Sequence, residues 1–227
     1  MTKWKLSLGF YRLKLNKMNK NNAFVKWYMI ITLPLILLFS SFYYWMYNDA
    51  YFQNQFEKFD VYSGFDLTKE ELNIKNSELI YYLKDGSNLI EDNFYNRAEK
   101  EHLRDVRVLM QGGTNLLIFL AVMWLTGIFI VKNDFYALLM KGSLLSIILF
   151  GAILLLIPLF ETAFIYFHQI FFKAGTWMFD PAVSNMKRMF PDEFFFAIVK
   201  NIFLTFGGLS LTGLFYSWKC MPKKLVK

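Results

Sequence analysis

The sequence predicts an all-α integral membrane protein with four transmembrane helices and an extracytoplasmic loop domain between the first two. Three observations support this. The 227 residues are 56% hydrophobic and 20% aromatic, and the apolar residues gather in long uncharged blocks. Basic residues flank alternate blocks, as the positive-inside rule requires. Tryptophans stand near the block ends, where an aromatic belt places them.

Four apolar blocks are long enough to cross the bilayer as helices, which takes about 20 residues. They cover residues 27–47, 114–131, 143–167 and 194–218, so the chain is predicted to be one membrane domain, 1–227. Pro34 and Pro158 lie inside blocks and are expected to kink the helices. In the fourth block, Gly207, Gly208 and Gly213 favour close helix packing.

The charges between the blocks predict that both termini are cytoplasmic. Residues 1–26 carry seven Lys or Arg and no acid, and the tail 219–227 carries four Lys and no acid. The segment 48–113 holds thirteen acids against eight bases, so it is predicted outside, together with 168–193. The formal net charge of +7 is therefore interpreted as membrane orientation and not as nucleic-acid binding.

Within the first outer loop, a helix is expected from Asp92 to about Gln111, ended by Gly112 and Gly113. Two ionisable residues fall inside predicted spans: Glu161 in the third and Lys200 in the fourth. A charge at membrane depth costs roughly 2.5–3.5 kcal/mol unless it pairs or reaches water. We therefore expect Glu161 and Lys200 to face each other or a hydrated cavity, or Lys200 to extend outward.

The two histidines, His102 and His168, are the strongest candidates for chemistry, because imidazole exchanges protons near neutral pH. Both are predicted at the outer membrane surface, His102 before the second span and His168 at the end of the third. Asp105 follows His102 by three residues and Glu161 precedes His168 by seven, so each histidine has an acid on its own helix face. The alternative is that both are solvated or packed interface residues.

Other catalytic signatures are missing from the sequence. It has no Gly-x-Ser-x-Gly, no His-Glu-x-x-His and no P-loop, and one Cys with two His cannot form a cysteine-rich zinc site. We therefore expect an enzyme of this sequence to need no metal or cofactor and to use acid–base chemistry on a lipid-borne group.

Two segments resemble the bacterial lipoprotein intramolecular transacylase family. The first is Glu101-His102-Leu103-Arg104-Asp105-Val106-Arg107, which is similar to the family's His-x-x-Asp-Val-Lys/Arg stretch. The second runs from Phe160-Glu161 to Phe167-His168-Gln169-Ile170-Phe171-Phe172 and continues with Trp177, Asp180-Pro181 and Phe190-Pro191-Asp192-Glu193-Phe194-Phe195. Glu161 stands where the family is expected to have Asp.

The resemblance implies an acyl transfer on diacylated bacterial lipoproteins at the outer face of the cell membrane. The sn-2 acyl chain moves from glycerol oxygen to the α-amine of the same N-terminal Cys, giving a lyso-form lipoprotein. His102 and His168 would be catalytic, with His102 favoured as base and Asp105 orienting it. Arg104 and Glu161 would support the two histidines. The substrate would contact three aromatic residues and one acid: Phe171, Phe172, Trp177 and Asp180.

Two other functions are compatible with the residues alone. A transporter subunit or assembly factor would have the same four spans, although the spans lack a continuous polar path. A membrane lipid-ester hydrolase would use the same histidines with water as the acceptor, and would release free fatty acid.

Overall fold

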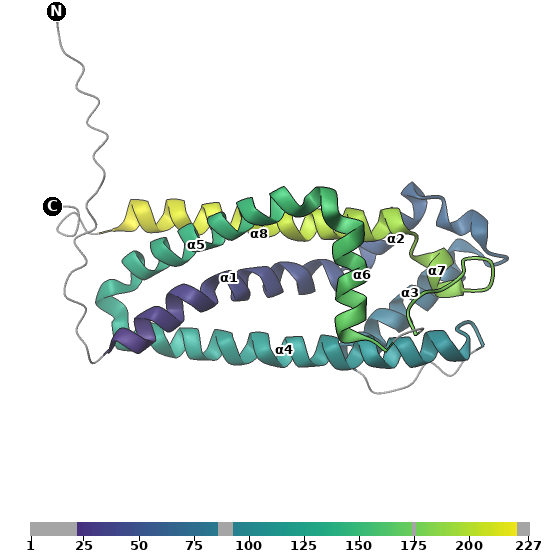
Figure 1. The fold of residues 1–227 in the computed structure, drawn as a ribbon, viewed down its shortest axis with the longest axis horizontal. Coiled ribbons are helices and arrows are strands. Elements are labelled where there is room, and N and C mark those ends of the chain that lie inside the picture. Colours follow the sequence, from purple (N-terminus) through teal and green to yellow (C-terminus); the bar gives the residue numbers. More distant parts are fainter. Residues whose placement is uncertain (1–21, 86–92, 174–175, 222–227) are drawn as a thin grey trace, which may run out of the picture.

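The computed structural model describes residues 22–85, 93–173 and 176–221, which form helices and connecting turns without strands. Four long helices run lengthwise: α1 (Ala23–Met46), α4 (Arg97–Val131), α5 (Phe135–Leu156) and α8 (Asp192–Cys220) (Figure 1). Shorter helices gather at one end: α2 (Asp49–Lys58), η2 (Val61–Gly64), α3 (Lys69–Lys84) and α7 (Asn185–Met189). The basic residues 1–21 and 222–227 lie outside the described residues.

Three helical segments are long and apolar enough to cross a membrane: α1, the continuous stretch Arg97–Phe171, and α8. The middle stretch of 75 residues contains two long helices, α4 and α5, and the chain reverses direction between them at η3 (Lys132–Asp134) (Figure 1). The protein is therefore a multi-pass, all-helical membrane protein.

Helix α1 is the centre of the bundle and packs against α4, α5 and α8. Near its start, Lys26 forms a 2.5 Å ion pair with Asp134 of η3. Two glycines of α8 allow this helix to approach α5 closely. A Cβ on Gly207 would meet the Phe150 ring of α5 at 2.9 Å, and one on Gly213 would meet Ser143 Oγ of α5 at 2.6 Å. Gly208 has open space instead, so the packing expected of the glycines in α8 applies to Gly207 and Gly213.

The expected helix end at Gly112 and Gly113 is wrong, because α4 continues through both residues to Val131. A Cβ on Gly113 would lie 2.3 Å from the Tyr43 hydroxyl of α1, and that hydroxyl donates to the Met110 carbonyl at 2.7 Å. Gly113 thus makes room for a neighbouring helix, and does not turn the chain.

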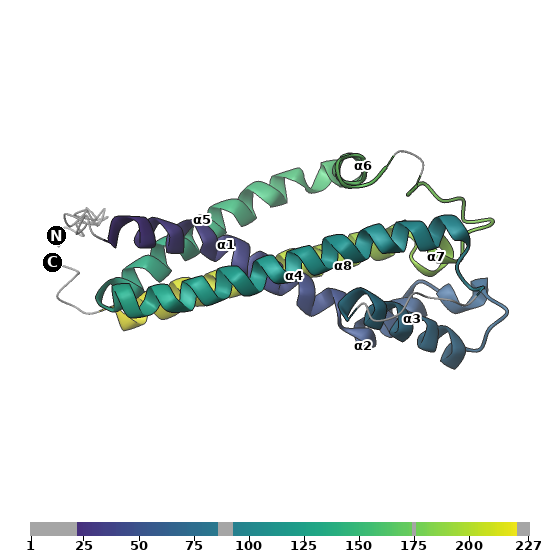
Figure 2. The same ribbon diagram turned by 90° about the horizontal axis from the view of Figure 1, so that it is seen from below.

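The predicted third span, 143–167, is not one helix. It divides into α5, the turn η4 (Ile157–Leu159) and α6 (Phe160–Phe171), and α6 lies across the long helices (Figures 1 and 2). Pro158 explains the break, since proline has no N–H to donate and its ring collides with the preceding turn. Glu161 consequently lies on α6, where it is exposed, and it makes no ion pair with the exposed Lys200.

The short helices α2, η2, α3 and α7 pack together around a core of their own, and we call them the outer unit. Phe56 of α2, Leu72 of α3 and Met189 of α7 are fully buried together, and Phe194 of α8 extends this core into the bundle. Capping boxes begin two of the helices, Thr68 with Glu71 at α3 and Asn96 with Glu99 at α4. This unit holds the first turns of α4 in place beside the segment that follows α6.

Candidate active site

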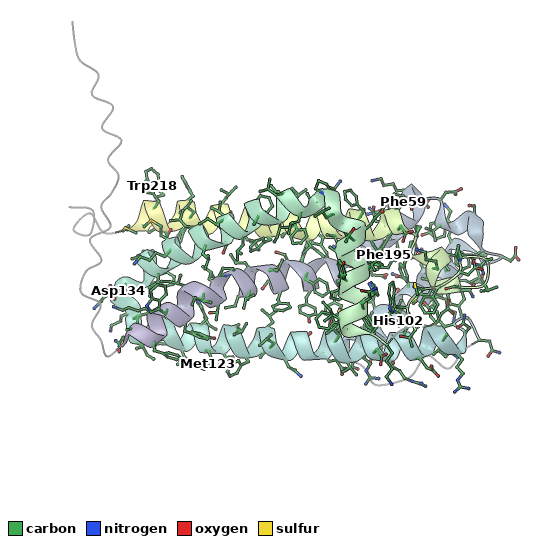
Figure 3. All side chains as sticks on the ribbon, in the orientation of Figure 1. Phe59, His102, Met123, Asp134, Phe195 and Trp218 are labelled. Atoms are coloured by element: carbon green, nitrogen blue, oxygen red, sulfur yellow. The ribbon has the colours of Figure 1, made fainter. Side chains whose placement is uncertain are left out.

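The two histidines, which are predicted to act together, lie side by side. His102 of α4 and His168 of α6 have ring centroids 6.1 Å apart with an interplanar angle of 22°. Helix α6 makes this possible because it crosses from the α5–α8 side to α4, and His102 lies beside the crossing (Figure 3). The break at Pro158 therefore has a direct consequence for the site.

Aromatic side chains surround both rings. Phe172 has its centroid 4.7 Å from His102 and 5.3 Å from His168. Phe179 lies 5.6 Å from His102, and Trp177 lies 4.8 Å from His168. We call Phe172, Trp177 and Phe179 the aromatic cover, because they come from the segment after α6 and shield the histidines from water. Only 7% of the His102 surface is exposed.

The cover changes the protonation of the histidines. Burial, and secondarily the nearby His168, lowers the pKa of His102 from 6.5 to about 4. Burial also lowers the pKa of His168, opposed by its hydrogen bond to the Phe164 carbonyl. Both rings are therefore neutral at pH 7.

The hydrogen bonds distinguish the two rings. His168 Nδ1 lies 2.7 Å from the Phe164 carbonyl oxygen, which can only accept, so Nδ1 carries the proton and Nε2 has the free lone pair. His102 Nδ1 is buried and has no hydrogen-bond partner. A buried polar nitrogen without a partner is costly in a folded protein, and such atoms are often found where a ligand binds.

The acids predicted to support the histidines are both exposed. Asp105 is exposed and lines a surface depression of about 260 Å³ with Glu101, Arg104, Lys173 and Thr176. Three residues along a helix leave an angle of about 60° between side chains, and here His102 points inward while Asp105 points to water. Glu161 is also exposed, two turns before His168 on α6.

The predicted substrate-binding residues divide in the same way. Phe172 and Trp177 contact the histidines, whereas Phe171 is half exposed and packs on Phe167. Asp180 closes a turn: its carbonyl accepts from Ser184 N at 2.9 Å and its carboxylate from Ala182 N at 2.9 Å.

Sequence reasoning missed Glu99, which is 1% exposed and lies one turn before His102. Its Oε1 accepts hydrogen bonds from Ser184 Oγ at 2.5 Å and from Met186 N at 2.8 Å. The pattern Asn96-x-x-Glu99 was a visible sign of a capping box. Nothing in the sequence indicated the bond to Ser184. In the part of the chain that the structure describes, no three His, Cys, Asp or Glu side chains gather as metal ligands would.

Comparison with known proteins identifies the family of the chain. The sequence profile of the family described as lipoprotein intramolecular transacylase Lit matches residues 27–195. No curated protein sequence has a significant match to the chain.

Solved structures share the fold. A crystal structure of the membrane integral lipoprotein intramolecular transacylase Lit from Bacillus cereus superposes with a TM-score of 0.76 at 22% identity, covering 91% of this chain and 96% of that one. Two variants of the same protein, with one histidine replaced by arginine or by alanine, superpose at 0.78 with 21% and 20% identity. They cover 90% and 92% of this chain, and 94% and 97% of theirs.

Proposed function

Since the chain belongs to the lipoprotein intramolecular transacylase family and is an acyltransferase, we propose that His102 and His168 catalyse its acyl transfer. The observation that carries this proposal is the pairing of the only two histidines of the chain, 6.1 Å apart inside an aromatic cover. Such a site excludes water while it holds two groups suited to proton transfer.

The substrate is a diacylated bacterial lipoprotein, and the reaction is an O-to-N shift within one molecule. The α-amine of the N-terminal Cys attacks the sn-2 ester carbonyl carbon, a C–N bond forms, and the C–O bond to glycerol breaks. One proton passes from nitrogen to the departing oxygen. Donor and acceptor are already joined, and intramolecular reactions gain effective concentrations of about 10⁵–10⁸ M when well oriented.

His168 is the better candidate for the base. Its Nδ1–H is held by the Phe164 carbonyl, so Nε2 is available to take the amine proton and return it to the glycerol oxygen. The sequence favoured His102 with Asp105 in this role. The exposure of Asp105 and the partnerless Nδ1 of His102 argue against that assignment.

His102 is suited to stabilise the oxyanion. A ring with a pKa of about 4 stays neutral, and its N–H donates to the negative oxygen that develops as the amine attacks. The aromatic cover would hold the acyl chain against the two rings, through Phe172 and Trp177. Arg104, Asp180 and Phe171 would act at the rim, where the lipoprotein peptide and neighbouring lipids approach.

We also infer four spans, with both ends on the cytoplasmic side of the bacterial cell membrane and the active site on the extracytoplasmic side. The first residues of α1, the turn η3 and the last residues of α8 lie at one end of the bundle (Figure 1). His102 lies toward the other end, near the outer unit (Figure 3), and His168 lies beside it. This arrangement matches the charge pattern that predicts the orientation.

The direct test is mass spectrometry of a model lipoprotein's N-terminal peptide. The protein and its His102→Ala and His168→Ala variants are expressed in a bacterium whose lipoproteins are diacylated with a free amine. We expect an N-acyl, S-monoacylglyceryl peptide of unchanged mass, lost in both variants. A peptide lighter by one acyl chain would indicate a hydrolase. Activity retained in both variants at normal protein levels would contradict the histidine mechanism.

A further inference from the structure

The aromatic cover is attached to α4 through a short, continuous chain of hydrogen bonds. Phe179 covers His102, and the turn closed by Asp180 follows it directly, with Ser184 N donating to the Asp180 carbonyl at 2.9 Å. Ser184 then donates its hydroxyl to Glu99 Oε1 at 2.5 Å, and Met186 N donates to the same oxygen at 2.8 Å. Glu99 and Ser184 are each 1% exposed.

We call the hydrogen bonds from Ser184 and Met186 to the Glu99 carboxylate the tie. All the groups that donate to this carboxylate are uncharged. Glu99 Oε2 accepts from Asn96 N at 2.6 Å, so both oxygens are occupied by backbone N–H groups and one hydroxyl. Ser184 is oriented as donor to Glu99 because its oxygen already accepts from Lys187 N at 3.0 Å. Charge-assisted bonds of this kind are stronger and shorter than neutral ones.

We propose that Glu99 is a positioning residue of the acyl transfer, which holds residues 177–186 against α4 so that the aromatic cover stays closed over His102 and His168. This inference rests on the proposed catalytic role of the two histidines. Glu99 does not touch the reacting atoms in this account. It acts through the turn at Asp180, and it keeps water away from the rings.

If the aromatic cover loosens, the pKa of His102 should change. A closed cover keeps the ring buried, and a loosened cover admits water, which stabilises the charged form. The ionisable group facing His102 from α6 is His168. Asp105 and Arg104 on its own helix and Lys173 after α6 are all exposed. Loss of the tie should therefore raise the pKa of His102, whereas loss of a nearby negative charge alone would lower it.

The experiment uses the full-length protein in detergent micelles with ring-labelled histidine, followed by NMR as a function of pH. The chain has two histidines, so two sets of ring signals are expected, and His168→Ala assigns them. In Glu99→Ala, which removes both charge and tie, we expect the His102 pKa to rise by roughly one unit or more. Glu99→Gln keeps an amide oxygen that accepts from Ser184 and Met186, and it loses only the bond from the exposed Asn96 N–H, because an amide nitrogen cannot accept, so its His102 pKa should not rise.

Two further variants complete the set. Ser184→Ala keeps the charge and removes one bond of the tie, so it should raise the His102 pKa by a smaller amount. Glu71→Ala removes the matching capping box of α3, which is exposed and has no bond to the site, and it should leave both histidines unchanged. The transacylation rate at saturating substrate should fall about tenfold or more in Glu99→Ala, and little in Glu71→Ala.

The results separate this inference from the proposed function. A His102 pKa that stays the same or falls in Glu99→Ala and Ser184→Ala overturns the positioning role. If His102→Ala remains active while Glu99→Ala still raises the pKa, the tie exists and the histidine mechanism is wrong. Thermal unfolding of each variant guards against misfolding, and Ser184→Ala decides the matter if Glu99→Ala does not fold.

Discussion

At the residue scale, the site depends on keeping a polar ring in an apolar surrounding. His102 lies among Phe172 and Phe179 with an unpartnered Nδ1, a costly position for an imidazole in a folded protein. The cost is tolerated because the surrounding core supplies a large gain from aromatic burial. In the proposed mechanism, this environment keeps the ring neutral and able to donate a hydrogen bond.

This burial predicts how stability depends on pH. The pKa of His102 is about 4 in the folded protein and 6.5 unfolded, so the unfolded state binds more protons between these values. Stability is fully present above pH 6.5 and is lost as pH falls toward 4, by about 3 kcal/mol at most. We expect thermal unfolding in detergent to show this loss in the wild type, and to show less of it in His102→Phe. Carboxylates titrate equally in both proteins, so an identical pH dependence would contradict the buried neutral histidine.

At the element scale, two helices decide the geometry: α4, which does not stop at its glycines, and α6, which does not continue α5. Helix α4 is unbroken from Arg97 to Val131, so it connects the outer unit to the lipid-facing part of the bundle. The Pro158 break redirects α6 across the bundle and brings His168 to His102. A straight third helix would have continued along α5 and would not have crossed to α4, where His102 lies (Figure 1).

Adjacent glycines on α4 provide a matched test of this packing. Gly113→Ala places a methyl group 2.3 Å from the Tyr43 hydroxyl, so we expect it to lower the free energy of unfolding by about 1–3 kcal/mol. Gly112 has open space, and Gly112→Ala should be neutral or stabilise the helix by up to about 1 kcal/mol. Thermal or denaturant unfolding measures both. If Gly112→Ala were the more damaging variant, the packing of α1 against α4 would have to differ from that described.

At the scale of the whole molecule, the two ends of the bundle are built differently. Lys26 and Asp134 pair at the end where α1 begins, and the outer unit of α2, α3 and α7 covers the other end. The proposed active site, His102 of α4 with His168 of α6, lies near this unit. A substrate with acyl chains in the membrane and a peptide in water fits such a boundary.

Labelling with a membrane-impermeant maleimide on intact cells tests the orientation. The only cysteine, Cys220, ends α8 and should react only after the cells are permeabilised. Ser63→Cys in a Cys220→Ser background places a thiol on the exposed outer unit, and it should react on intact cells. The reverse pattern would invert the topology, and labelling of both residues on intact cells would contradict four spans.

The sequence by itself determined the class of protein and the membrane family, and it predicted two catalytic residues. Hydrophobic block length, charge alternation and the rarity of histidine are properties of local sequence, so they can be recognised without a fold. The long apolar blocks, His102 and His168 were all identified in this way.

Only the tertiary structure decided which residues meet. Helical spacing suggested Asp105 and Glu161 as partners of the histidines, yet both side chains are exposed, because the direction of a side chain depends on how its whole helix is packed. The contact of Glu99 with Ser184 joins residues far apart in the chain, and no local pattern encodes it. From the sequence alone, Gly113 likewise indicates a helix end, whereas in the structure the Tyr43 hydroxyl occupies the space that a side chain at this position would need.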